Sequence, residues 1–135
     1  MSIQVNKIIK ELAIVNYGYV SSSCQIENIY KFCLDYPFQY VPVCDDGQLT
    51  GVINRKELIS QSYKTIKDKF VRNFKEDVPY TALNTSHPLS LLKQMSILKT
   101  NAVIIIDEWS NYIGIFDLLK AKKFVHHVHN IAPNF

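Results

Sequence analysis

The chain has 135 residues, of which 47% are hydrophobic and 20% are charged, and its formal net charge is +3 at neutral pH. This length suits one ordinary domain or two small interlocked halves, and the composition is that of a globular protein rather than a disordered one. The mild positive charge permits an anionic ligand but does not predict nucleic-acid binding, which usually needs a denser basic face. No apolar run approaches the roughly 20 residues of a membrane-spanning helix.

Cysteine usage and the N-terminal sequence indicate the compartment. The three cysteines, Cys24, Cys33 and Cys44, form no closely spaced pair, and an odd number of cysteines fits a reducing compartment. The first residues do not place an apolar core behind a charged segment, as a secretory signal does. We therefore expect a cytoplasmic protein that is neither secreted nor inserted in a membrane.

Residues 1–17 predict an amphipathic helix, because their apolar residues recur at helical spacing. Asn6 would cap this helix, and Gly18 lies where it would end. Its apolar face carries Ile3, Val5, Ile8, Ile9 and Leu12. Two interpretations stay open: the helix packs on the body of its own chain, or it seals a contact between subunits.

The next segment predicts a short strand followed by a helix. Tyr19 and Val20 would form the strand, and the serines from Ser21 to Ser23 offer caps for the helix and hydroxyl groups beside a ligand cleft. Pro37 would end the helix, because proline disfavours helical geometry in the residue before it. The core-facing residues of this helix are Ile26, Ile29, Tyr30, Cys33 and Leu34.

A hairpin is predicted around Asp46 and Gly47. This dipeptide favours a tight turn, because glycine tolerates positive φ and aspartate bonds its own backbone. The strands on either side would be Tyr40–Cys44 and Leu49–Ile53, and polar residues from Asn54 onward would open a helix.

From Arg55 to Phe74 the sequence predicts an extended basic helix. Its apolar residues Ile59, Tyr63, Ile66, Phe70 and Phe74 recur at helical spacing. Its basic residues are Arg55, Lys56, Lys64, Lys67, Lys69 and Arg72, with Lys75 just beyond. Such a run is usually the solvated face of an amphipathic helix, and a surface for phosphate or an acidic partner is the second interpretation. The segment 76–79 would be a hinge.

The second half predicts the same order of elements. A strand at Tyr80–Leu83 precedes a helix whose first turn accepts Pro88. A strand at Asn101–Ile106, a polar turn, and a return strand at Tyr112–Phe116 lead into a helix from Asp117 onward. The predicted inward residues of the first of these helices are Leu89, Leu92, Met95, Ser96 and Leu98.

The two hairpins therefore form an internal repeat, in which Gly51 and Gly114 hold equivalent places. The string Pro42-Val43-Cys44-Asp45-Asp46-Gly47, followed by Gly51-Val52-Ile53-Asn54, resembles the P-V-V-D-x-x-G…G-h-h-T signature of the CBS domain, named after cystathionine β-synthase. A weaker copy of this signature is Ile105-Ile106-Asp107 with Gly114-Ile115-Phe116-Asp117. A further, weaker likeness is to CBS pairs of bacterial cyclic-dinucleotide signalling proteins.

The resemblance implies an α+β fold in which two pseudo-symmetric β-α-β-β-α units stack as a pair, with an extra N-terminal helix. The chain would divide into the N-terminal helix at 1–17, a first unit at 18–77, a second unit at 78–125 and a tail at 126–135. Clefts of such pairs often bind adenosyl compounds such as AMP, ATP or S-adenosylmethionine. We therefore expect such a ligand, but no required cofactor.

The resemblance also implies the residues of the first cleft. The family motif G-h-x-S/T-x-x-D binds phosphate through its hydroxyl and ribose through its carboxylate. In this chain Asn54 stands at the hydroxyl position and Glu57 at the carboxylate position, with Arg55 supplying charge. An amide donates to phosphate, and an ionised carboxylate accepts from both ribose hydroxyls. Substitution has therefore altered this cleft but left it usable.

The base in such clefts lies against backbone groups and apolar walls. This implicates Tyr40 and Pro42, together with Val20 and Ser21 from the preceding strand. For Tyr40, a role as an edge aromatic that covers the core is equally open.

The second copy departs further from the motif. Asp117 stands at the hydroxyl position and would repel phosphate, while Lys120 replaces the ribose-binding carboxylate and has no acceptor atom. We expect no ordinary nucleotide site there, and we expect Asp117 to cap the last helix.

Two other groups of residues have side chains suited to metal binding or catalysis, but the sequence gives little support for either role. His126, His127 and His129 have a spacing that suits a polar tail near a helix C-terminus better than a zinc site, which needs three or four ligands. Cys24 and His87 would be a nucleophile and its base only with an activating arrangement that the sequence does not supply. An enzyme is therefore the least favoured class.

Two hypotheses remain. The leading one is a non-enzymatic regulatory module that forms a homodimer, senses an adenine nucleotide or similar anion in the first cleft, and modulates a protein partner. The alternative is a module that has lost its ligand and serves as a dimerisation or protein-interaction scaffold within a signalling system. Neither predicts binding to nucleic acid or membrane.

Overall fold

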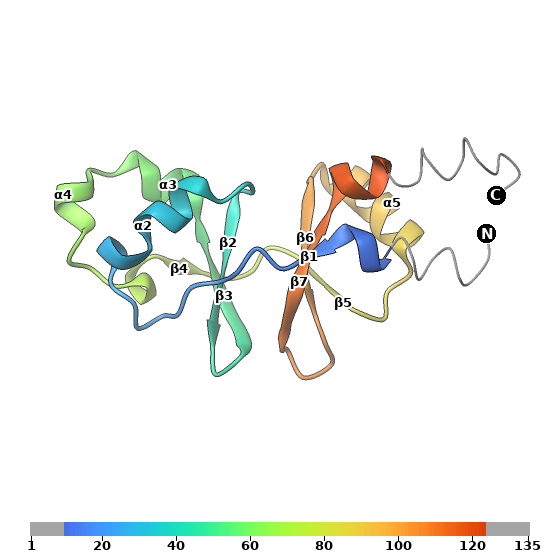
Figure 1. Ribbon diagram of the computed structural model, residues 1–135, viewed down its shortest axis with the longest axis horizontal. Helices are drawn as coiled ribbons and strands as arrows, with labels where there is room; N and C mark the ends of the chain where they lie inside the picture. Colours follow the sequence, from blue (N-terminus) through green and yellow to red (C-terminus); the bar gives the residue numbers. More distant parts are fainter. Residues whose placement is uncertain (1–9, 124–135) are drawn as a thin grey trace, which may run out of the picture. The chain divides into compact units, whose positions relative to one another are not determined.

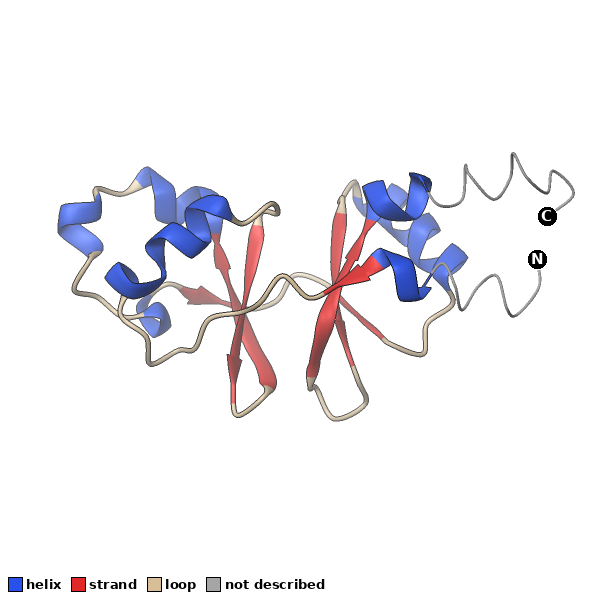
Figure 2. Ribbon diagram, in the orientation of Figure 1, coloured by secondary structure: helices blue, strands red, loops and turns tan. Residues whose placement is uncertain are grey.

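The structure is a computed structural model that describes residues 10–123 (Figure 1). The chain forms two compact units, each built around one of the predicted repeats. The repeat-1 unit comprises Tyr17–Pro79 and Trp109–Tyr112. Among the described residues, the repeat-2 unit comprises 10–16, 80–108 and 113–123. Both units combine a sheet with helices (Figure 2), as the sequence predicted for this α+β chain.

The repeat-1 unit has a sheet in the order β2-β3-β4, with bounds Tyr40–Asp45, Gln48–Asn54 and Lys75–Glu76. Asp46 and Gly47 both have positive φ, 53° and 80°, which is the geometry of the predicted tight turn. Val20 forms a parallel bridge with Val43. The other elements are α2 at Ile26–Asp35, α3 at Arg55–Ser60, α4 at Tyr63–Ile66 and the 3-10 turn η1 at Val71–Asn73.

Residues 109–112 belong to the repeat-1 unit because they bond to its hairpin turn. The backbone N–H of Leu49 donates to the Ser110 carbonyl at 2.9 Å, and the N–H of Tyr112 donates to the Gly47 carbonyl at 3.1 Å. The Gln48 side chain donates to the carbonyl of Trp109 at 2.9 Å.

The repeat-2 unit has a sheet in the order β1-β7-β6-β5. The bounds are Ile14–Val15 for β1, Tyr112–Asp117 for β7, Ala102–Ile106 for β6 and Thr81–Leu83 for β5. β5 runs parallel to β6, and β1 is antiparallel to β7. Helix α5 (Pro88–Leu98) and the helical residues 10–13 and 118–123 pack on this sheet.

The two signature glycines are explained by close approach of a neighbouring strand. A Cβ on Gly51 would lie 2.7 Å from the Glu76 carbonyl oxygen in β4, and a Cβ on Gly114 would lie 3.0 Å from the Val15 carbonyl oxygen in β1. The N-terminal strand β1 thus takes in one sheet the place that β4 takes in the other. The sheet of the second repeat is therefore completed by β1, which precedes the first repeat in the sequence.

Each unit has its own apolar core. In the repeat-2 unit the core is formed by Ala13, Ala82, Leu91, Met95, Val103, Ile105, Phe116 and Ala121. In the repeat-1 unit the fully buried side chains include Ile26, Val41, Val43, Val52, Ile53, Leu58 and Ile66. The β-branched residues of β2, β3 and β6 supply much of both cores, as expected for strands buried by helices.

Three sequence predictions about elements are wrong. The N-terminal helix does not reach residue 17, since the described helical residues end at Ala13 and Ile14–Val15 form β1. The basic stretch is not one helix but α3, α4 and η1 in succession. In α5, Met95 is buried and Leu92 is half-buried as predicted, but Leu89, Ser96 and Leu98 are exposed, and the other buried residues are Pro88 and Leu91.

No helix within residues 10–123 is long and apolar enough to cross a membrane.

Candidate functional site

The register of β2 and β3 brings together the residues that the sequence analysis assigned to the first cleft. Tyr40 pairs directly with Asn54, and Pro42 pairs with Val52. Pro42 is buried and has no N–H, and its carbonyl accepts from the N–H of Val20 at 3.0 Å. The carbonyl of Val20 in turn accepts from the N–H of Cys44 at 2.9 Å. Two ladder bonds therefore hold Val20 and Ser21 beside β2.

Asn54 and Glu57 stand at the two ends of the first turn of α3. Asn54 is the N-cap of this helix, and its side-chain oxygen accepts from the N–H of Glu57 at 3.4 Å. Because the oxygen faces the helix, the amide nitrogen of Asn54 is the part of the side chain with hydrogens to donate. Glu57 is exposed.

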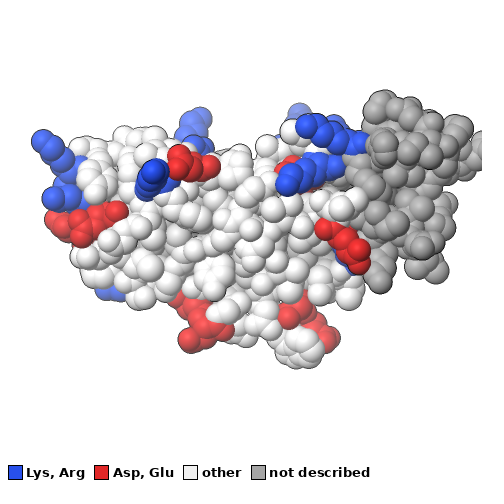
Figure 3. Space-filling model, in the orientation of Figure 1, with Lys and Arg blue, Asp and Glu red and all other residues white. Residues whose placement is uncertain are grey.

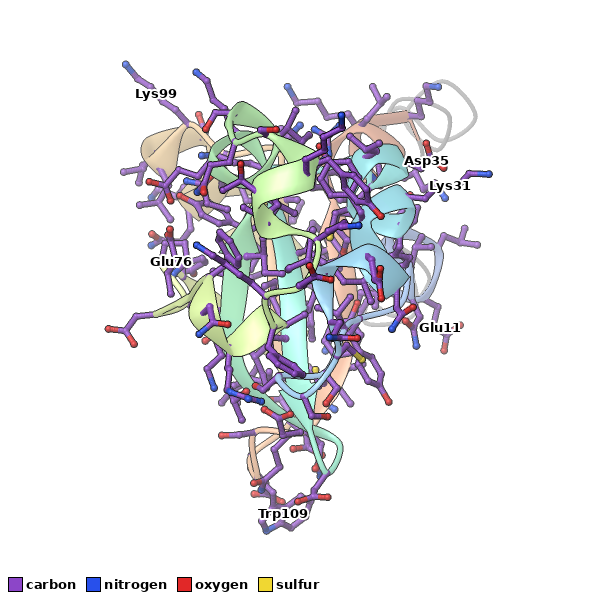
Figure 4. All side chains as sticks on the ribbon, turned by 90° about the vertical axis from the view of Figure 1, so that its left-hand side faces the viewer. Glu11, Lys31, Asp35, Glu76, Lys99 and Trp109 are labelled. Carbon is purple, nitrogen blue, oxygen red and sulfur yellow. The ribbon has the colours of Figure 1, made fainter. Side chains whose placement is uncertain are left out.

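Glu57 has an acidic neighbour that the sequence analysis did not identify. Glu76 in β4, which is labelled in Figure 4, pairs with Val52 of β3. Its carboxyl interacts with the carboxyl of Glu57 through a side-chain hydrogen bond. The hydrogen bond with Glu57, then burial and then repulsion from Glu57 raise the pKa of Glu76. A ligand group placed here would therefore meet two carboxyls and would bind best as a donor of hydrogen bonds.

Arg55 points to a different part of the unit. Its Nε donates to the Cys33 carbonyl and its Nη2 to the Leu34 carbonyl, both at 2.7 Å, so the guanidinium closes the C-terminal end of α2. A cation at this end of a helix is favoured by the helix dipole and by the unpaired carbonyls. The side chain therefore has a structural role whether or not it also contributes charge to a ligand.

We predict that Arg55→Ala lowers the free energy of unfolding by about 1–3 kcal/mol, since two charge-assisted hydrogen bonds are lost, of which the bond to the Cys33 carbonyl is part-buried and the bond to the Leu34 carbonyl is exposed. Arg55→Lys should recover only part of this loss, because one ammonium cannot reproduce the fork. Urea denaturation measures both, with the exposed neighbour Lys56→Ala as the control. Equal losses for Arg55→Ala and Lys56→Ala would contradict the structural role.

Ser21 belongs to a polar cluster around Asp45. The Asp45 carboxylate accepts from the Ser21 hydroxyl at 3.2 Å, from the Ser22 hydroxyl and N–H at 2.6 and 3.0 Å, and from the Thr50 hydroxyl at 2.7 Å. Lys75 Nζ donates to the Ser22 hydroxyl at 3.2 Å and to the Thr50 hydroxyl at 3.5 Å. The hydroxyl hydrogen bonds from Ser22 and Thr50 lead in lowering the pKa of Asp45 to about 2.

Asp45 was absent from the predicted site residues. Its signal was its place in the repeat signature, directly before the turn, but its partners Ser21 and Ser22 come from a segment more than 20 residues earlier. The cluster fixes that segment against the end of β2. The side-chain hydroxyl of Ser21 is thereby bound to Asp45, and its backbone carbonyl accepts from the N–H of Cys24 at 3.1 Å.

The equivalent residues of the second repeat have the capping role that was predicted. Asp117 is buried, and its Oδ1 accepts from the N–H groups of Leu119 at 3.0 Å and Lys120 at 3.5 Å. The carboxylate thus caps the helix that begins at residue 118.

The residues considered for catalysis or metal binding take part in structural hydrogen bonds. His87 is the N-cap of α5, where its Nδ1 accepts from the N–H of Leu89 at 3.1 Å. The carbonyl of Cys24 accepts from Val71 at 2.8 Å. Burial raises the pKa of the Cys33 and Cys44 thiols to about 12. Within residues 10–123, no group of three His, Cys, Asp or Glu residues is placed to hold a metal ion. The cluster His126, His127 and His129 lies outside the described residues.

Comparison of the sequence with protein-family models and with curated proteins found no match. Comparison of the fold with solved structures found many. The CBS domain of a bacterial CNNM/CorC family Mg²⁺ transporter in complex with ATP is 18% identical, with a TM-score of 0.66 and coverage of 92% of this chain and 94% of that one. CBSX2 in complex with AMP is 15% identical, with a TM-score of 0.70 and coverage of 89% and 97%.

A CBS domain protein from Streptococcus pneumoniae TIGR4 has a TM-score of 0.75 at 12% identity, with coverage of 95% of this chain and 89% of that one. At such identities the likeness concerns the fold, and it extends over nearly the whole of each chain. It agrees with the repeated hairpin signature and with the close strand at each signature glycine. The chain therefore has the fold of a CBS domain pair.

Proposed function

We propose that this chain is a regulatory module that binds an adenosyl nucleotide, or a similar anionic small molecule, and that it is not an enzyme. The observation that carries the proposal is the register of β2 and β3, which sets Tyr40 opposite Asn54, with Glu57 one helical turn further on. Support also comes from two structures of the same fold, of which one is in complex with ATP and the other with AMP.

Each polar residue of this site has a distinct role in the proposal. The Glu57 carboxylate accepts from ribose hydroxyls, and the amide of Asn54 donates to a phosphate oxygen. Arg55 supplies positive charge while it stays bound to the carbonyls of α2. Because Glu76 adds a second carboxyl beside Glu57, the ribose end of the site favours neutral hydroxyls over phosphate.

The base would lie against the strand residues. Tyr40 is half-buried and offers a ring, and Pro42 offers a buried apolar surface. Val20 and Ser21 lie next to β2, where the Val20 N–H and carbonyl and the Ser21 carbonyl already have backbone partners. We propose that these residues serve mainly as part of the wall against which the base lies.

The module would act by a shift in population. A ligand that binds one arrangement of the protein more tightly than another changes the balance between them, and a protein partner reads that balance. We propose that the module does this as a cytoplasmic homodimer.

A scaffold without a ligand is the second candidate, and particular contacts favour it. The Arg55 guanidinium is already bonded to two carbonyls, and the Ser21 hydroxyl is bonded to Asp45. In the second repeat, Asp117 is occupied as a helix cap. Side chains that would bind a nucleotide in this fold therefore stabilise the protein itself.

Thermal unfolding in the presence of AMP, ADP, ATP, S-adenosylmethionine and cyclic dinucleotides tests the proposal. A ligand at about 100 times its dissociation constant adds roughly 2.7 kcal/mol of stability, which raises the unfolding temperature of a chain of this size by several degrees. We expect at least one adenosyl compound to give such a rise. The rise should be lost in Glu57→Ala and in Asn54→Ala.

Glu27→Ala is the matched control, since Glu27 is an exposed glutamate in the first turn of α2 in the same unit. This variant should keep the full ligand-induced rise. A rise that persists in Glu57→Ala would assign the ligand to another place. No rise with any compound, in a folded dimer, would favour the scaffold.

A further inference from the structure

The turn between β6 and β7 presents the single tryptophan of the chain to solvent. Trp109 is 66% exposed, the largest exposed fraction among the large hydrophobic residues that the structure describes. Figure 4 shows its side chain at the outer end of this turn, directed away from the ribbon. Exposure of a large aromatic ring is unfavourable in water, and such rings are enriched where proteins bind partners.

The turn that carries Trp109 is held in a defined shape. The Gln48 side chain donates to the Trp109 carbonyl at 2.9 Å, and two backbone hydrogen bonds join the same turn to the β2-β3 hairpin. Ser110 has a positive φ of 66°, a conformation that persists where surrounding contacts enforce it. The Tyr112 ring packs edge-on against that of Tyr19, with 5.7 Å between the centroids. A partner would therefore meet an aromatic ring on a turn that is already ordered.

The two hairpins are acidic, whereas the remainder of the chain is basic. Residues 40–54 and 101–117 contain no lysine or arginine, and all 15 basic residues lie outside these ranges. The acidic residues of the hairpins are Asp45, Asp46, Asp107, Glu108 and Asp117. Figure 3 shows acidic side chains at the lower edge of the view, where the loop of the β2-β3 hairpin lies. Negative charge therefore accompanies the exposed tryptophan in a chain whose net charge is +3.

Two of these carboxylates lie where a partner can reach them. Asp46 is exposed in the hairpin turn to which the turn of Trp109 is bonded, and Glu108 is exposed and joined to Trp109 by a peptide bond. Asp45 is set aside, because its carboxylate accepts four hydrogen bonds and Lys75 bonds to the hydroxyls around it. We define the tip surface as Asp46, Glu108 and Trp109.

We propose that the tip surface is a docking site for a basic extended segment of a protein partner. A lysine or arginine side chain of that segment would lie over the Trp109 ring in a cation–π contact, and neighbouring cations would pair with the carboxylates of Asp46 and Glu108. The proposal goes beyond the proposed function, because it assigns a surface and a chemical class to the partner. It does not depend on nucleotide binding, since Asn54 lies at the other end of β3, about 20 Å away at the usual rise of a strand.

Charge argues against two other occupants. An anionic membrane surface would repel both carboxylates of the tip surface, whereas loops and helices that bind membranes usually set basic residues beside their aromatic rings. A second copy docked through the tip surface about a two-fold axis would set the same carboxylates against each other.

Tryptophan fluorescence of the full chain tests this assignment, because the emission comes from Trp109 alone. The probe is a flexible synthetic peptide of about 12 residues, in which arginine alternates with glycine and serine. A second peptide carries glutamate in place of arginine. We expect the arginine peptide to change the emission saturably and to bind at least about tenfold more tightly than the glutamate peptide, with an affinity that falls as salt is raised.

Two variants remove the two kinds of contact, and anisotropy of an end-labelled arginine peptide measures both. Trp109→Ser removes the ring, and Asp46→Asn with Glu108→Gln removes the charges while it keeps the side-chain sizes. Asparagine also tolerates the φ of 53° at position 46. Each variant should weaken binding of the arginine peptide about fivefold or more. Because all three residues are exposed, the variants should unfold at temperatures close to that of the parent.

The matched controls lie in the helical part of the repeat-1 unit. Tyr63→Ser removes an aromatic ring that is 40% exposed, and Glu27→Gln with Asp68→Asn removes two exposed carboxylates. Both controls should leave the affinity for the arginine peptide unchanged. A loss in these controls as large as that in the tip variants would show that the peptide responds to charge and aromatic content in general, and would contradict the proposal.

Four further outcomes would overturn the proposal. Equal binding of both peptides, or of neither, would deny a basic segment as the occupant. Undiminished binding in Trp109→Ser would place the peptide elsewhere on the chain. A blue shift of the emission with phosphatidylcholine vesicles, without peptide binding, would assign the tip surface to a lipid surface. A dimer that light scattering shows to dissociate in Trp109→Ser, while peptide affinity stays unchanged, would assign it to a second copy.

Discussion

Replacement of Gly51 by alanine is expected to lower the free energy of unfolding by about 3 kcal/mol, at the upper end of the usual cost of overpacking. A Cβ at this buried position would lie 2.5 Å from Cγ of Lys75 and 2.7 Å from the carbonyl oxygen of Glu76. The lysine side chain can move, but the carbonyl is part of β4, which pairs with β3. The two strands must therefore separate. Urea denaturation at neutral pH measures the loss.

Two other glycines serve as graded controls for this steric effect. At Gly47 a Cβ would find its nearest neighbour 4.0 Å away, but φ is +80°, so Gly47→Ala should cost only the roughly 1–2 kcal/mol of left-handed backbone. At Gly114 the nearest atoms would lie at 3.0 Å, so the loss should be smaller than at Gly51. Adding Lys75→Ala should recover part of the Gly51→Ala loss. A loss at Gly51 no larger than that at Gly47 would contradict the steric account.

The same contact shows how far the sequence could predict the fold. The equivalence of Gly51 and Gly114 was visible in the repeat, and the turn chemistry of Asp46 and Gly47 predicted the hairpin between β2 and β3. The sequence did not show which strand lies against each glycine, namely β4 against Gly51 and β1 against Gly114. β1 has two residues, and its partner β7 lies about 100 residues further along the chain, so local periodicity continued the preceding helix through it.

The basic stretch after Arg55 was predicted as one helix for a similar reason. The spacing of its apolar residues is helical, but two of its backbone carbonyls bond to another helix. The carbonyls of Lys67 and Lys69 accept from the N–H groups of Glu27 and Ile26 at 3.0 and 2.8 Å. These are first-turn donors of α2, whose N-cap Gln25 makes no side-chain cap. The carbonyls of Lys67 and Lys69 therefore cap the first turn of α2, and the segment that contains them does not continue as a helix.

The face of α5 was mispredicted because apolar residues surround that helix. Leu89 and Leu92 are spaced i, i+3 and fit one stripe, whereas Leu91 and Met95 are spaced i, i+4 and fit another, and periodicity alone does not choose between them. In the structure the second stripe is buried.

For the candidate site residues, the sequence predicted which residue types belong to the cleft. It did not predict which of these side chains form hydrogen bonds within the protein itself. Tyr40 and Asn54 are brought together by the strand register, which shifts by one residue between Val43 and Cys44; without this shift the two-residue turn would set Tyr40 opposite Ile53. The bonds of Arg55 to α2 and of Ser21 to Asp45 depend on the packing of segments distant in sequence. Whether these residues bind a ligand stays a prediction.

The Asp45 cluster should make stability depend on pH in acid. Because its pKa falls from 3.8 to about 2 on folding, the folded protein binds this proton less tightly than the unfolded chain does. The stabilisation is therefore fully present above pH 3.8 and is lost as the pH falls toward 2. Asp45→Asn should lower the free energy of unfolding by about 2 kcal/mol at pH 7, since an amide accepts fewer of the four hydrogen bonds.

The decisive measurement is the difference in unfolding free energy between the parent and Asp45→Asn from pH 7 down to the lowest pH at which both fold. This difference should shrink as the carboxyl of the parent becomes protonated, because both proteins then present a neutral side chain to the hydroxyls of Ser22 and Thr50. Asp46→Asn is the matched control: it is adjacent and exposed, and its φ of 53° is well tolerated by asparagine. A difference that stays constant with pH for Asp45→Asn would show that the ionised carboxylate is not what holds residues 20–22 beside β2.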